Sequence, residues 1–257
     1  MLTVISPAKT LDFVTPPTTN KHTNPEFLDH SSELIQILKK HPPKKLRKLM
    51  KISDKLAELN AQRFNDWNLP FTQENAKQAI LAFRGEVYLG LEAENLNSRD
   101  LTFAQKHLRI LSGLYGVLKP LDLIQPYRLE MGAKLKNRAG NDLYQFWGNH
   151  LSTAIETELA SHRSRVLVNL ASQEYFKSLH GSDLSVQVIN PVFKDYSNGR
   201  YRVLSFFAKK ARGFMANYIV RNRINKAEDL KTFDTDGYKF NKTLSNENQW
   251  VFSRKPG

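Results

Sequence analysis

The stretch "RILSGLYGVLKPLDLIQPYRLEMG", from Arg109 to Gly132, combines an apolar run with turn residues and charges. It contains three glycines, two prolines and two arginines among leucines and isoleucines. A purely structural strand does not need these residues. One interpretation is a strand, a turn and a second strand. The other is a loop that holds a ligand at the end of a sheet, where irregular backbone and charge are useful.

Apolar strands on either side of this stretch predict the fold class. "LTVIS" (2–6), "LRILS" (108–112) and "RVLVNLAS" (165–172) read as buried strands, and helical patterns lie between them. This interleaving predicts an α/β class (mixed α+β), with a mixed sheet in one compact domain over residues 1–257. Further predicted helices cover 27–40, 44–64 (two short ones), 72–83, 98–107, 141–160 and 211–224, and further strands cover 186–193, 200–210, 237–244 and 249–255.

The three strands each end at a serine and continue into a polar or turn-forming segment. In open α/β sheets, ligands bind beyond the carboxyl ends of the strands. Side chains just after these ends are therefore expected to converge on one cleft, namely Lys9, Tyr115, Ser172 and Glu174. The alternative is that each serine simply begins a turn.

Composition excludes several classes of site. The chain has no cysteine, so disulfides, thiolate metal sites and iron–sulfur clusters are absent. None of the seven histidines (His22, His30, His41, His107, His150, His162 and His180) lies three or four residues from another. We therefore expect no metal site and no cofactor. The start of the sequence has no basic leader and no apolar run reaches membrane length, which favours a cytoplasmic protein without a membrane partner.

Positive charge is concentrated in two stretches. The net charge is +13, and residues 39–63 and 200–223 each carry a balance of +7. The rest of the chain is therefore near neutral. A local excess indicates an anionic partner, with nucleic acid the leading candidate. The alternative is a solvated helix face that contributes only solubility.

The loop in the opening stretch carries a candidate anion site. Gly113 and Gly116 permit positive φ or a close backbone approach, and the prolines stiffen the segment. Arg128 and Glu130 are two residues apart, so on an extended segment they point to the same side. They form either a plain ion pair or an anion hook oriented by a carboxylate.

Long blocks of the sequence resemble the YaaA family of peroxide stress response proteins. The blocks are "ISPAKTLDF", "LMKISDKLAELNAQRF", "AILAFRGEVYLGL", "LSGLYGVLKPLDLIQPYRLEMG", "DLYQFWG", "NLASQEYFK" and "FFAKKARGFMANYIV". The resemblance implies a cytoplasmic protein that helps cells survive hydrogen peroxide by lowering available iron. It also implies a compact α/β fold with a positively charged cleft, a helix-hairpin-helix element and DNA binding. No established reaction comes with it.

Two basic segments are the predicted DNA contacts. The first is a helical hairpin at about 44–64, with Ser53 or Asp54 as the cap of its second helix. Its turn lacks the glycine that is usual in a helix-hairpin-helix, so lysines and the Ser53 hydroxyl would replace part of the phosphate grip. The candidate residues here are Lys44, Lys45, Lys48, Lys51, Ser53 and Lys55. The second segment offers Lys209, Lys210 and Arg212, predicted to follow a strand and precede a helix.

Two functions therefore compete. The favoured one is a stress protein that binds double-stranded or distorted DNA through a basic cleft and limits damage linked to intracellular iron. The other is an enzyme acting on a small anionic or nucleotide substrate, with a pocket lined by Lys9, Arg84, Tyr115, Arg128, Glu130, Ser172 and Glu174. Direct iron binding is disfavoured, because no helical Glu-x-x-His pattern is present. A small closed pocket would favour the enzyme, and an open groove continuous with 44–55 would favour DNA.

Overall fold

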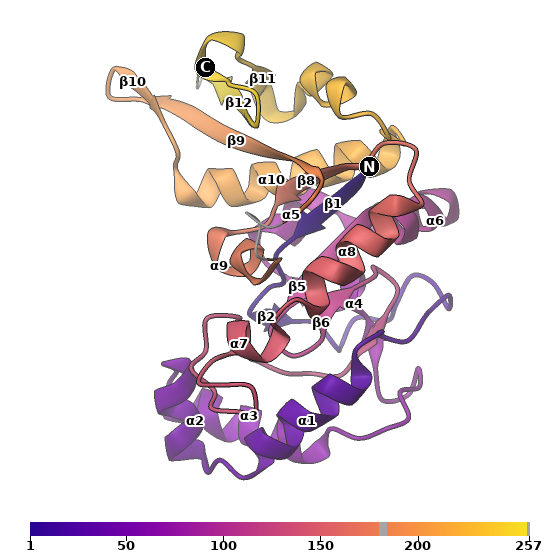
Figure 1. Cartoon of the computed structure of the whole chain (residues 1–257), viewed down its shortest axis with the longest axis vertical. Helices are drawn as coiled ribbons and strands as arrows, with labels where there is room; N and C mark the ends of the chain where they lie inside the picture. The colour runs from indigo at the N-terminus through magenta and orange to yellow at the C-terminus, as the bar shows by residue number, and fades with distance from the viewer. Residues whose placement is uncertain (180–183, 256–257) are drawn as a thin grey trace.

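Three of the predicted strands lie side by side at the centre of one sheet (Figure 1). In the computed structural model, which describes residues 1–179 and 184–255, β1 (Leu2–Ile5) runs parallel to β5 (Leu108–Ser112) and to β8 (Val166–Leu170). The side chains of β1 and β5 are buried, as expected for the middle of an α/β sheet. His180 lies outside the described residues.

The remaining strands make the sheet mixed, as predicted. Within the described ranges it has eight strands, with a main path β11-β12-β9-β8-β1-β5-β6 and β10 paired to β9. The parallel strands β9 (Gln187–Ser197) and β12 (Gln249–Arg254) extend it on one side. Antiparallel partners are β6 (Gly116–Leu118), β10 (Arg200–Arg202) and β11 (Lys239–Phe240).

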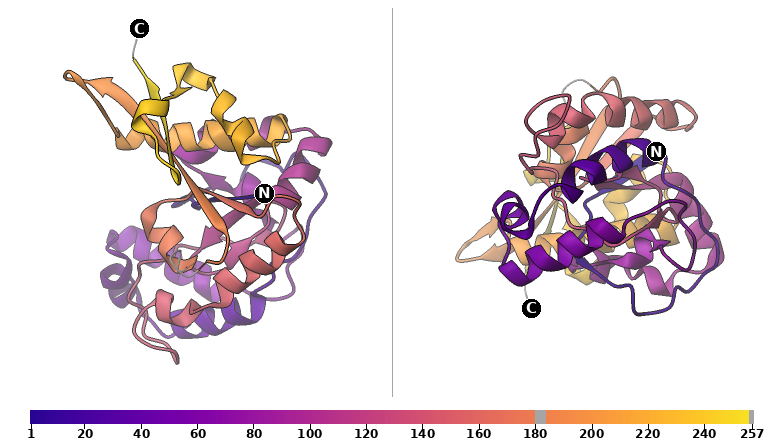
Figure 2. Two further views of the ribbon diagram at one scale, coloured as in Figure 1. Left: turned by 45° about the horizontal axis from the view of Figure 1, so that its top comes forward. Right: turned by 90° about the horizontal axis from the view of Figure 1, so that it is seen from below.

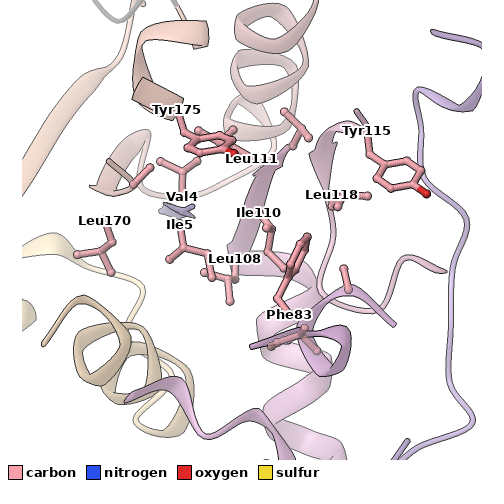
Figure 3. Packing of buried hydrophobic residues seen from close by; sticks show 14 of the residues in the cluster. Val4, Ile5, Phe83, Leu108, Ile110, Leu111, Tyr115, Leu118, Leu170 and Tyr175 are labelled. Atoms are coloured by element: carbon pink, nitrogen blue, oxygen red, sulfur yellow. The ribbon is translucent and has the colours of Figure 1, made fainter. Parts of the chain in front are cut away.

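Helices cover both faces of the sheet and enclose its core. Figure 3 shows Val4 and Leu111 on one face and Ile5 and Ile110 on the other, because successive strand residues alternate. On one side lie α8 (His150–Ala160) and α9 (Gln173–Phe176). On the other lie α5 (Glu86–Leu91), α6 (Ser98–His107) and α10 (Ser205–Arg221).

The two basic stretches occupy different ends of the molecule. Helices α1 (Leu28–Lys39), α2 (Pro43–Met50) and α3 (Asp54–Asp66) gather at the lower end in Figure 1, which Figure 2 (right) views from below. The β9–β10 hairpin and α10 lie toward the opposite end. Any ligand that contacts both stretches must therefore be extended.

The helix predicted over 72–83 is wrong for most of its length. Only Ala79–Ala82 is helical (α4), while Lys77–Gln78 forms β3 and pairs with β7 (Leu123–Ile124). The Lys77 ammonium is buried and donates hydrogen bonds to the carbonyl oxygens of Asp12 and Thr15, at 2.9 and 2.7 Å. These long-range contacts hold the segment extended against its local helical pattern.

The helix predicted over 141–160 is divided into α7 (Leu143–Trp147) and α8, because Gly148 takes φ +44° between them. The helix predicted over 98–107 is confirmed as α6, and Asn97 caps it in a capping box with Asp100.

The strand predicted over 200–210 ends at Arg202, and α10 already begins at Ser205. Lys209, Lys210 and Arg212 thus lie inside a helix rather than before one. The physical reason is the helical spacing of Ala208, Ala211 and Met215, which are buried. That spacing outweighs the alternation on which the strand was predicted.

Candidate functional site

The carboxyl ends of β1 and β8 meet at Ser6 and Ser172. The backbone N–H of Ser172 donates to Ser6 Oγ at 2.8 Å, and the two hydroxyl oxygens lie 3.3 Å apart. From β1 the sheet continues to β5 on one side and to β8 on the other. This reversal of strand order is the position at which open α/β sheets bind ligands.

An irregular segment, residues 127–130, lies at this edge of the sheet and ends in a turn at 131–132. A Cβ on Gly113 would lie 2.3 Å from the Leu129 carbonyl oxygen, so only glycine lets the two backbones approach this closely. The hydroxyls of Ser112 and Tyr127 are hydrogen bonded at 2.7 Å. The turn after β5 therefore fixes the segment that carries Arg128 and Glu130.

Charged side chains from three segments converge here, and all four of them are predicted pocket residues. Glu130 Oε1 lies 3.1 Å from Arg128 Nη2 and 3.2 Å from Lys9 Nζ. Glu174 accepts a hydrogen bond from the Gly132 N–H at 2.9 Å, which ties α9 to the same loop. Lys9, Arg128, Glu130, Ser172 and Glu174 thus gather at one edge, which we call the loop cluster.

Arg63 of α3 approaches the loop cluster and was not predicted as a site residue. Burial, followed by repulsion from Arg128, lowers the pKa of Arg63. Among the described residues, its hydrogen-bond acceptor is the side chain of Asn60, at 3.4 Å. The Arg128 Nε is itself buried and has no hydrogen-bond partner in the described part of the chain. Two arginines that repel each other and lack full compensation favour an anion beside them.

Two predicted pocket residues lie outside the loop cluster. Arg84 forms ion pairs with Asp12 at 3.1 Å and with Glu94 at 3.4 Å. Tyr115 is fully buried, and its hydroxyl accepts a hydrogen bond from Trp67 Nε1 at 3.1 Å. Both side chains therefore support the fold around the site and do not face it.

The hollow at the loop cluster is very small. It measures about 10 Å³ and is lined by Lys9, Arg128 and Glu130, together with Tyr127 and Tyr175. That volume accommodates roughly one water molecule. The loop cluster is therefore a surface of interacting charges and not a chamber for a metabolite.

The second group of predicted residues lies on the helical hairpin formed by α2 and α3. The two helices are joined by Lys51, Ile52 and Ser53, and Lys51 takes the left-handed conformation (φ 52°) in place of the usual glycine. Ser53 caps α3 by accepting a hydrogen bond from the Leu56 N–H at 3.4 Å. The lysines are all exposed: Lys44, Lys45, Lys48, Lys51 and Lys55.

The third group, on α10, is less uniform than the sequence suggested. Lys209 is exposed, and Lys210 is half-buried with its ammonium 5.3 Å from the centre of the Phe214 ring. Arg212 is also half-buried, and burial lowers its pKa. Lys209 is thus the most accessible of the three cations.

Metal ligands do not cluster in the described ranges. No group of three or more His, Asp or Glu residues there is arranged to hold a metal ion. Two histidine pairs do lie close together, with ring centres 4.8 Å apart for His30 and His150 and 4.9 Å apart for His107 and His162. Among the helices of the same residues, none has the length and apolar character needed to cross a membrane.

Comparison with known proteins identifies relatives over the full length of the chain. Residues 1–244 match the family model described as peroxide stress protein YaaA. A UPF0246 protein of Cellvibrio japonicus (strain Ueda107) is 56% identical over 255 residues, which is 99% of each chain. A UPF0246 protein of Janthinobacterium sp. (strain Marseille) is 54% identical over 257 residues, which is 100% of each chain.

Proposed function

The chain belongs to the peroxide stress protein YaaA family, and from this membership we propose that it is a cytoplasmic protein that protects DNA during peroxide stress by binding it. In this proposal the protein limits damage linked to intracellular iron by covering the duplex. The predicted positively charged cleft, and the action of α2–α3 as a helix-hairpin-helix, are parts of the same proposal.

One observation supports DNA binding most strongly: the exposed cations of the α2–α3 hairpin. Five lysines project into solvent from α2, from the turn and from the first turn of α3. Within the described residues, the one ion pair of this hairpin joins Arg47 to Asp54, at 3.1 Å. A group of exposed lysines without acidic partners is typical of proteins that bind phosphate groups of nucleic acids.

The start of α3 adds directional donors to this charge. The first N–H groups of a helix have no partner within it, and they favour anions. Asp54 opposes a phosphate there, but its carboxylate is neutralised by Arg47. Lys51 and Lys55 flank the same turn, so a phosphate would meet two ammonium groups and the backbone together. This arrangement substitutes for the missing glycine of the hairpin.

The size of the loop cluster does not favour the enzyme alternative. Pockets for ligands as large as a nucleotide measure roughly 300–1,000 Å³, while the hollow here measures about 10 Å³. Its charges fit an exposed phosphate of a polymer better than an enclosed substrate. Arg63 and Arg128 would then continue the basic surface from α3 onto the edge of the sheet.

The test is binding of a duplex by a charge-reversal variant. Lys51→Glu/Lys55→Glu should weaken the affinity for a fluorescein-labelled duplex by at least about tenfold at low salt, because two phosphate contacts become repulsive. Lys239→Glu/Lys242→Glu is the matched control, since it removes the same charge from exposed positions elsewhere. Equal affinities of the two variants would contradict the proposal.

A further inference from the structure

The first turns of α10 present two phenylalanine rings to solvent. Phe206 is 60% exposed and Phe207 is 42% exposed, and the rings contact each other edge to face at 5.7 Å. The buried side of α10 carries small and aliphatic residues and methionine, with no aromatic ring. Neighbouring exposed aromatic rings are uncommon on a surface without a partner. They are therefore candidates for a binding surface.

Cations surround these rings without acidic neighbours in sequence. Lys209 and Lys210 follow Phe206 by three and four residues, so they share its face of the helix. From residue 196 to residue 227 the chain has eight Lys or Arg residues and no Asp or Glu. Val203, which is 52% exposed, lies just before the helix. We call Val203, Phe206, Phe207, Lys209 and Lys210 the aromatic–basic patch.

Phe207 has a structural role that Phe206 lacks in the described contacts. The Arg254 guanidinium lies 4.9 Å from the centre of the Phe207 ring, and Arg254 pairs with the buried Asp195 at 2.5 Å. Phe207 therefore links α10 to β9 and β12. Phe206 is more exposed, so it is the ring whose position the fold explains least.

We propose that the aromatic–basic patch binds unpaired DNA bases, with a base stacked on Phe206 and the adjacent phosphates on Lys209 and Lys210. This inference rests on the proposed function. A pair of rings beside a pair of cations suits a single strand, because each base has a face that stacks and each phosphate has a charge. In an intact duplex the bases are already stacked, so the patch would favour gaps, flaps and other distorted sites.

The patch lies at a different end of the molecule from the α2–α3 hairpin (Figure 1). A duplex arm held by the hairpin and an unpaired stretch held by α10 would therefore occupy separate surfaces. Charge complementarity favours DNA over an apolar protein partner, because burying Lys209 and Lys210 against apolar groups is costly.

The main experiment compares the wild type and three variants on two probes by fluorescence anisotropy, and a fourth variant, Phe206→Ala, serves in the sedimentation and vesicle assays. The probes are a paired duplex and the same duplex with a short gap in one strand. The wild type should bind the gapped probe about tenfold more tightly than the paired one. Phe206→Leu, which keeps apolar bulk but removes the ring, should lose this preference and retain its affinity for the paired duplex. Phe206→Tyr should keep the preference, and Leu89→Ala is a matched control at another exposed apolar position.

The outcomes that contradict the inference differ from the one that contradicts the proposed function. A wild type that binds both probes equally, or a Phe206→Leu variant that keeps the preference, excludes stacking while leaving duplex binding intact. Failure to bind the paired duplex contradicts the proposed function instead. Two further assays measure self-association by sedimentation and binding to anionic phosphatidylserine vesicles. If either activity is present, is retained by Phe206→Leu and is lost by Phe206→Ala, the patch is an apolar docking surface and the inference is wrong.

Discussion

At the scale of single residues, Glu130 organises the loop cluster because it accepts from two cations at once. Its carboxylate contacts Arg128 at 3.1 Å and Lys9 at 3.2 Å. Lys9 is mostly exposed, with 67% of its side chain accessible, while Arg128 is only 16% accessible. Arg128 is thus the cation that the fold holds in place, and Lys9 is free to move toward a ligand.

Arg128→Ala should abolish protection in a peroxide-survival assay while the protein remains folded. Glu130 keeps its ion pair with Lys9 in this variant, so no uncompensated carboxylate is left behind and the fold is retained. Arg138→Ala is the matched control, because Arg138 is exposed and pairs with Glu33 at 3.1 Å. Survival of complemented cells and thermal unfolding of both variants provide the measurement. Full protection by a soluble Arg128→Ala protein would show that the loop is structural.

Asp122 should make stability depend on pH between about 4 and 6. Burial raises the pKa of Asp122 to about 6, from an ordinary value of 3.8. A raised pKa in the fold means that the protonated form is stabilised, so its contribution is complete below the unfolded pKa. The contribution is lost as pH rises through about 6, and the total change is up to about 3 kcal/mol.

Asp122→Asn isolates this effect, because asparagine does not titrate. The unfolding free energy of the wild type minus that of Asp122→Asn should fall as pH is raised across this window. Urea unfolding at a series of pH values measures the difference. A difference that instead grows with pH would show that the hydrogen bonds from Thr23 Oγ1 and the Lys119 N–H dominate over burial.

Residue-level predictions from sequence succeeded where spacing fixed geometry. Arg128 and Glu130 were predicted to point to one side, and their side chains are paired. Tyr115 was misplaced as a pocket residue, because its strand-end position did not reveal that Trp67 would cover its hydroxyl. Arg63 was missed for the same reason: its approach to Arg128 depends on how α3 packs, which its own helix does not show.

At the scale of elements, α10 and α5 cross at two glycines. A Cβ on Gly213 would lie 1.9 Å from the Val87 carbonyl oxygen, and one on Gly90 would lie 2.3 Å from the Lys210 carbonyl oxygen. These are backbone atoms, so neither clash can be relieved by a side-chain rotation. The close approach positions the start of α10, and with it the aromatic–basic patch.

Gly213→Ala should therefore destabilise the protein by more than about 2 kcal/mol, because the two helices must separate. The sign of the stability change distinguishes the two cases, since a Gly→Ala change in an unconstrained helix stabilises the protein by up to about 1 kcal/mol. Gly90→Ala should act similarly. The double variant should lose less unfolding free energy than the two single variants lose together, because one separation of the helices relieves both clashes. Urea unfolding tests all three, and a stabilised Gly213→Ala protein would contradict the crossing.

Element prediction from sequence depended on whether local patterns agreed with long-range contacts. The strands β1 and β5 are buried throughout and β8 is largely buried, and all three were predicted within one or two residues. The segment 72–83 failed because Lys77 finds its partners at Asp12 and Thr15, far away in the chain. The order of strands also could not be derived, since it depends on which non-local pairs form.

At the scale of the whole molecule, the net charge of +13 resides largely at two ends. The α2–α3 hairpin lies at one end and α10 toward the other (Figure 1). If one DNA molecule contacts both ends, each group of lysines should contribute separately to the salt dependence of binding. If the charge serves only solubility, neither group should affect the salt dependence of binding.

The salt dependence of duplex binding distinguishes these cases. For a duplex, the slope of log affinity against log salt is roughly −0.9 for each phosphate neutralised. Lys51→Ala/Lys55→Ala should flatten this slope by up to about two units on the paired duplex, and Lys209→Ala/Lys210→Ala should flatten it by a similar amount on the gapped duplex. Anisotropy titrations over a range of salt concentrations give the slopes for the wild type and both variants.

The quadruple variant, which combines Lys51→Ala, Lys55→Ala, Lys209→Ala and Lys210→Ala, tests whether both ends of the protein bind the same DNA molecule. Sites this far apart should change the slope additively, by up to about four units in total, and should weaken binding to all sequences alike. Lys239→Ala/Lys242→Ala, with the same loss of charge at other exposed positions, should leave the slope unchanged. If the α10 variant leaves the paired-duplex slope unaltered while the hairpin variant flattens it, the duplex engages one end only, and α10 is left for unpaired strands. Slopes unchanged in every variant would remove DNA binding as the basis of peroxide protection.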